Sequence, residues 1–136
     1  MPGITIHDAS ADGQCLAFDL RELLDVIQDW LPISCWRVRS LECTGDSAAV
    51  LHAFSDTDAE LDGIRLRRLA DGVVQTIDGE LIGVLNGSPH DQIVIRAVDS
   101  TCFDVECTDS EVLARYRTRF RLVEEFPPGV TYLNAK

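Results

Sequence analysis

The carboxylates have the greatest capacity for chemistry in this chain. Asp78, Glu80, Asp99 and Asp104 stand at or near the expected turns of one run of strands. If neighbouring turns meet at one end of a sheet, these side chains would form a possible ligand cluster for a divalent ion or for acid–base catalysis. Aspartate is also favoured in turns for structural reasons alone, and we favour that interpretation of these positions.

A second set of acidic residues has a pattern suited to binding a protein. Its members lie on an expected first helix and in the most acidic stretch of the chain: Asp25, Asp29, Asp56, Asp58, Glu60 and Asp62. If the two segments adjoin in space, they would form one acidic face for a basic partner. Residues 58–63 also copy the first half of a calcium-binding EF-hand loop. The twelfth position, which requires a glutamate, is Leu69, so an acidic loop that caps the next helix is the better interpretation.

The sequence contains no Gly-x-Ser-x-Gly elbow, no glycine-rich phosphate loop and no Cys-x-x-Cys pair. Its three histidines are far apart, and a zinc site built from His52, Cys35 and Cys43 would need adjacent strands to bring them together. We therefore expect no catalytic residue, no cofactor and no bound metal.

The net charge is strongly negative, −11 at pH 7 from 23 acidic and 12 basic side chains. Nucleic-acid phosphates and anionic membranes both require a basic surface, so neither is an expected partner. An acidic protein is instead attracted to cationic partners. No window of about 18 apolar residues suggests a membrane span, and the first residues do not form a secretory signal. The cytoplasm is the expected compartment.

Three segments have helical patterns. Residues 20–31 place leucines and isoleucines at i, i+3, i+4, i+7 and i+11, with Asp19 as the expected N-cap and Pro32 as the end. A short helix is expected over residues 64–70. The last helix is expected to open on the capping-box spacing of Thr108 and Glu111, with Val123 at the end of its buried stripe.

The strand patterns predict an antiparallel sheet. Residues 34–43 alternate, and their parity changes near Ser40, which indicates either a β-bulge or the end of a strand there. Residues 49–54 form a further candidate strand. Residues 73–107 predict a four-strand meander whose first hairpin turns at Asp78-Gly79. With the N- and C-terminal helices packed on one face, the fold class is α+β. We expect one domain over residues 1–126 and a C-terminal tail over 127–136.

Three stretches of the meander carry a family resemblance: residues 75–83, residues 95–100 and Phe103-Asp104-Val105. Over roughly residues 73–120 the chain resembles small, acidic, uncharacterised bacterial proteins of the immunity type. The resemblance implies a non-catalytic protein that neutralises a toxin, which here would be cationic, and it implies no particular functional residue. The alternative is a small enzyme or a ligand- or metal-binding domain that uses the turn carboxylates. The oligomeric state stays open.

Overall fold

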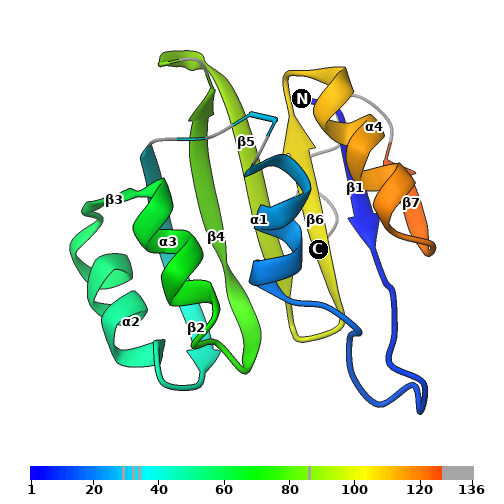
Figure 1. Cartoon of the computed structure of the whole chain (residues 1–136), viewed down its shortest axis with the longest axis horizontal. Helices are drawn as coiled ribbons and strands as arrows, with labels where there is room; N and C mark the ends of the chain where they lie inside the picture. Colours follow the sequence, from blue (N-terminus) through cyan, green and yellow to red (C-terminus); the bar gives the residue numbers. More distant parts are fainter. Residues whose placement is uncertain (29, 32, 34, 86, 127–136) are drawn as a thin grey trace.

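A computed structural model describes residues 1–28, 30, 31, 33, 35–85 and 87–126, and in these residues it has seven strands and four helices. All strand pairs are antiparallel, in the order β3-β2-β4-β5-β6-β1-β7 (Figure 1). The strands are β1 (Gly3–Ile6), β2 (Cys35–Thr44), β3 (Glu60–Asp62), β4 (Gln75–Leu85), β5 (Ser88–Val98), β6 (Cys102–Cys107) and β7 (Val123–Phe126). The helices are α1 (Leu20–Gln28), α2 (Ala48–Thr57), α3 (Gly63–Ala70) and α4 (Ser110–Arg119).

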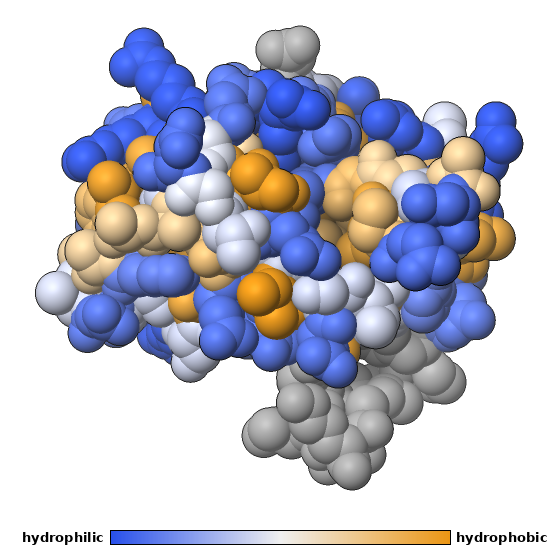
Figure 2. Space-filling view, turned by 90° about the horizontal axis from the view of Figure 1, so that it is seen from below, coloured by the Kyte–Doolittle hydropathy of each residue, from blue (hydrophilic) through white to orange (hydrophobic). Residues whose placement is uncertain are grey.

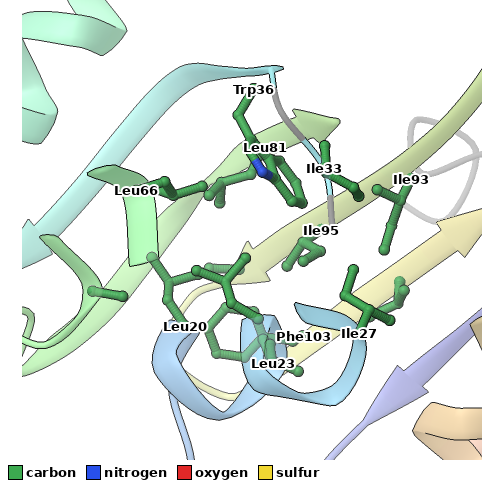
Figure 3. Packing of buried hydrophobic residues seen from close by; sticks show 14 of the residues in the cluster. Leu20, Leu23, Ile27, Ile33, Trp36, Leu66, Leu81, Ile93, Ile95 and Phe103 are labelled. Carbon is green, nitrogen blue, oxygen red and sulfur yellow. The ribbon is translucent and has the colours of Figure 1, made fainter. Parts of the chain in front are cut away.

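The core lies between the sheet and the layer formed by α1, α3 and α4 (Figure 1). Leu81 and Ile95 are register partners on β4 and β5, and both are fully buried. Leu23 and Ile27 of α1 reach the same core, as their helical spacing predicts (Figure 3). Burying one such side chain contributes roughly 1.5–3 kcal/mol, so this layer contact is the main source of stability. The α+β class and the packing of the N- and C-terminal helices on one face are thereby confirmed.

The predicted hairpin at Asp78-Gly79 is wrong, because β4 runs through this pair without turning. The bulge expected near Ser40 is confirmed: Ser40 has φ 50°, and the register between β2 and β4 shifts after Arg39. Gly79 lies across from the bulge with φ 136°, and a Cβ there would stand 2.7 Å from the Leu41 Cα. This glycine therefore accommodates a bulge rather than a turn, and the meander runs through β4, β5 and β6.

The strand predicted at residues 49–54 is also wrong, because this segment belongs to α2. Helix α2 lies along the edge of β2 and supplies hydrogen-bond acceptors to it. Beyond its short pairing with β3, β2 has amide groups that need acceptors. The Leu41 amide donates to Ser55 Oγ at 3.0 Å, and the Cys43 amide donates to His52 Nε2 at 3.3 Å. Helix α2 thus covers the exposed edge of β2 with side-chain acceptors.

The ends of the chain differ from expectation in two details. Asp109, not Thr108, is the N-cap of α4 and accepts a hydrogen bond from the Glu111 amide at 2.9 Å. Val123 lies in β7, opposite Ile6, rather than in the helix. The predicted tail, residues 127–136, lies outside the described residues. No helix in the described part of the chain is long and apolar enough to span a membrane.

Candidate functional site

The second face of the sheet carries a line of polar side chains, which we call the polar row. In Figure 1, α1, α3 and α4 lie in front of the sheet and α2 lies beside the edge of β2, so this face has none of the four described helices on it. Successive register pairs place one member of the row on each of six strands. Its members are Arg39, Glu80, Arg96, Asp104, Thr5 and Glu124.

Arg96 is the centre of this row. Its Nε donates to Glu80 Oε2 at 2.8 Å, and its Nη1 donates to Glu106 Oε2 at 2.7 Å. Burial opposes the charge of the guanidinium, but the hydrogen bonds to the two carboxylates outweigh burial and raise the pKa of Arg96. Glu106 is only 6% exposed, and Arg96 is its ion-pair partner.

Asp104 lies next to Arg96 in the row and has a different environment. Thr5 Oγ1 donates to its Oδ1 at 2.6 Å. Burial raises the pKa of Asp104, and the nearby Glu106 raises it further, while the Thr5 hydrogen bond and the charge of Arg96 lower it. Strands β4, β5 and β6 therefore place three carboxylates around one guanidinium, and this part of the row has excess negative charge.

The four carboxylates of the possible ligand cluster form two neighbouring pairs rather than one centre. Glu80 and Asp104 flank Arg96 within the polar row, in the middle of strands. Asp78 accepts a hydrogen bond from the Asp99 amide at 2.8 Å, near the turn between β5 and β6. A shallow hollow of about 370 Å³ lies over the bulge and is lined by Arg39, Ser40, Asp78, Gly79, Glu80, Arg96 and Ala97. Among the described residues, no group of three or more His, Cys, Asp or Glu side chains is placed to hold a metal ion.

The second acidic set is largely neutralised by arginines of the same chain. Both oxygens of Asp25 accept hydrogen bonds from Arg67, at 2.6 and 3.2 Å. These bonds, together with the one that Arg67 Nη1 donates to Asp71 Oδ1 at 2.7 Å, raise the pKa of Arg67. Asp58 and Glu60 pair with arginines of β2, at 3.3–3.5 Å.

The remaining members of this set have separate positions. Asp62 caps α3, accepting from the Ile64 and Arg65 amides at 2.8 and 3.2 Å. Asp56 is exposed on α2, and Asp29 lies outside the described residues. Helix α3 lies between α1 and β3 (Figure 1), so Asp25 and the acidic stretch of residues 56–62 do not form one continuous acidic face.

The charges of the two layers have opposite signs. Helices α1, α3 and α4 carry seven arginines and three carboxylates, whereas the strands carry ten carboxylates and three arginines. The space-filling view from below also shows that hydrophilic residues interrupt the hydrophobic ones on that side (Figure 2). The acidic character of the chain is therefore concentrated in the sheet and not in the helix layer.

Cys43 and His52 do come together, as one sequence hypothesis required. The Cys43 Sγ lies 3.9 Å from His52 Nε2. Burial raises the pKa of Cys43, so the thiol is poorly prepared to act as a nucleophile. Cys35 lies at the opposite end of β2, roughly 26 Å away at the usual rise of a strand. The three residues do not form a zinc site.

Sequence reasoning missed Arg96, Glu106 and Thr5 as parts of the site. The signal was present in the alternation of residues 93–98 and 102–107, which already separates an apolar side from a polar one. That alternation does not predict the strand register, and only the register places Arg96 between Glu80 and Asp104.

Comparisons of the chain with protein-family models, with curated proteins and with solved structures found no match. The interpretation of the site therefore depends on its own geometry.

Proposed function

We propose that this chain is a non-catalytic protein-binding domain whose partner is a basic protein. The separation of charge between the two layers is the observation that carries the proposal. An acidic sheet opposite a basic helix layer gives the molecule an electric dipole. A cationic partner would therefore be attracted to the sheet side first. Such steering acts mainly on the rate of association and on specificity.

The state of the carboxylates supports binding over catalysis. Glu80 and Glu106 are both held by Arg96, and Asp78 accepts a backbone amide. A general acid or base needs a position near a reacting group and a pKa near the working pH. Carboxylates that are held in ion pairs and in hydrogen bonds to backbone amides are better suited to stabilising the fold and supplying surface charge than to transferring protons.

The specific form that we propose is an immunity-type protein that neutralises a cationic toxin in the cytoplasm. It combines the family resemblance of residues 73–120 with the acidic sheet. A toxin whose active surface is basic, such as one that acts on nucleic acid, has the charge that this sheet would attract.

The test is to purify the product of the neighbouring gene and to measure its association with this chain at several salt concentrations. We expect a basic partner and an association rate that falls about tenfold or more between 50 and 500 mM salt, because screening shortens the range of the attraction. An acidic partner, or an association rate indifferent to salt, would contradict the proposal.

A further inference from the structure

We infer that a cavity between α1 and α3 is a binding site for a small, neutral aromatic molecule that carries a hydrogen-bond acceptor. The floor of this cavity consists of buried apolar side chains, namely Leu24 and Ile27 of α1, Ile33, and Trp36 of β2. Figure 3 shows the Trp36 ring beside Ile33, with Ile27 on the side of α1. The inference does not depend on the proposed function, because the cavity lies in the helix layer, whereas the acidic charge is concentrated in the sheet.

The size of the cavity suits a single aromatic ring. Its volume is about 220 Å³, and an apolar cavity of about 150 Å³ already accommodates benzene. The additional volume leaves room for a small substituent on the ring. Ile64 of α3 lies at the mouth and is 65% exposed. A bound ring would remove part of this apolar surface from water, which favours binding.

The indole of Trp36 supplies a hydrogen-bond donor to the cavity. Trp36 is only 2% exposed, and its Nε1–H donates to no acceptor among the described residues. The Nε1 is the Trp36 atom nearest to Gly63, where an added Cβ would lie 3.7 Å from it, and both residues line the cavity. A donor removed from water without an acceptor costs free energy. A ligand oxygen in the cavity would provide that acceptor.

The charge at the mouth is already neutralised, which favours an uncharged ligand. Arg67 is the one charged residue among those that line the cavity. Each of its three nitrogens donates to a carboxylate, since Nε and Nη2 bind Asp25 and Nη1 binds Asp71. Gln28 is exposed at the mouth and carries an uncharged amide. A carboxylate or ammonium group on the ligand would therefore gain no unpaired counter-charge here.

NMR titration of the nitrogen-labelled chain with acetophenone tests the site, and ethylbenzene is the control ligand of similar shape without an acceptor. The chain has two tryptophans, Trp30 and Trp36, so its spectrum contains two indole N–H signals. Acetophenone should shift the Trp36 indole signal saturably, together with amides of α1 and α3. An indole signal that stays unchanged up to the solubility limit of acetophenone would overturn the inference.

Trp36→Phe isolates the contribution of the donor, because it removes the N–H and keeps an aromatic ring. This variant should bind acetophenone about three- to tenfold more weakly, the value of one hydrogen bond, and change ethylbenzene binding less than about twofold. The α1 and α3 amides report both affinities. Equal changes for the two ligands would show that the indole N–H does not recognise an acceptor and would overturn that part of the inference.

Two variants at exposed positions test the cavity itself without altering its buried floor. Ile64→Trp places a large side chain at the mouth and should abolish acetophenone binding. Val74→Trp is the matched control, because Val74 is 78% exposed and does not line the cavity, and it should leave binding unchanged. Equal losses in both variants, or no loss in either, would overturn the site, and neither result would affect the proposed binding of a basic protein.

Discussion

The Asp19 carboxylate joins the start of α1 to β4 through Thr76. Oδ1 accepts the Thr76 hydroxyl at 2.6 Å, and Oδ2 accepts the Thr76 amide at 2.9 Å. Oδ1 also lies 2.8 Å from the amide of Leu20, the first residue of α1. Thr76 is fully buried, so one side chain satisfies polar groups of both the helix layer and the sheet.

Asp19→Ala should therefore destabilise the chain by about 2–4 kcal/mol, because it removes a helix cap and leaves buried groups of Thr76 without an acceptor. Urea unfolding followed by circular dichroism measures the change. Asp56→Ala, at an exposed position of α2, is the control and should lower the stability by less than about 0.5 kcal/mol. Equal effects of the two substitutions would show that Asp19 does not connect the layers.

Local patterns identified much of this fold but not the pairing of its strands. The periodicity of residues 20–31 gives α1, and the parity change near Ser40 gives the bulge. Asp78-Gly79 was misleading, because a glycine with positive φ serves a hairpin and a bulge equally well. The choice between them depends on Leu41, which is 38 residues away in the sequence. The candidate site has the same difficulty, since Arg96 gains its role only from the register of β5 with β4 and β6.

Gly79→Ala should destabilise the chain by about 3 kcal/mol. The backbone at φ 136° is strained for any residue with a Cβ, and the new atom would stand 2.7 Å from the Leu41 Cα. Gly13→Ala is the matched control, because Gly13 also has positive φ, 71°, but open space around it. The control should cost about 1 kcal/mol. Thermal-shift measurements compare the stability of the two variants. Similar losses of stability would mean that the contact with Leu41 at the bulge is unimportant.

Arg96→Met should cost about 3–5 kcal/mol, because it leaves the buried Glu106 without its cation. Arg37 also binds two carboxylates, Asp58 and Glu60, but its side chain is 40% exposed, so Arg37→Met should cost less than about 1 kcal/mol. Denaturant unfolding of the two variants at pH 7 makes the comparison. The role given to Arg96 fails if its variant is as stable as that of Arg37.

Thiol labelling should separate the cysteines by burial. Cys15 is exposed, while Cys43, Cys102 and Cys107 are buried. Burial raises the pKa of all three buried thiols, that of Cys107 to about 11. Iodoacetamide should therefore modify Cys15 at least about a hundredfold faster than Cys107, because the thiolate is the reactive form. Mass spectrometry of the native chain gives the rates, and Cys15→Ser should remove the fast phase. Rapid modification of Cys43, Cys102 or Cys107 in this variant would contradict their burial, whereas Cys35 is half-buried and is not part of this comparison.

Asp104→Asn should make the chain more stable at neutral pH. The pKa of Asp104 is raised in the folded chain mainly by burial. A carboxyl whose folded pKa exceeds its unfolded pKa contributes most to stability when both states are protonated, and this contribution is lost as pH rises through the folded value. Asparagine carries no charge at any pH, so it avoids this loss and can still accept the Thr5 hydroxyl.

The stability of the Asp104→Asn variant relative to the wild type should therefore increase as pH rises from about 3, below the usual aspartate pKa of about 3.9, to 7. Urea unfolding at a series of pH values measures this difference, and Asp56→Asn is the exposed control. A variant that is less stable than the wild type at pH 7, with a gap that closes on acidification, would mean that the charged form of Asp104 is the favoured one in the fold. In that case Arg96 and Thr5 together would outweigh burial, and the pKa of Asp104 would not be raised in the folded chain.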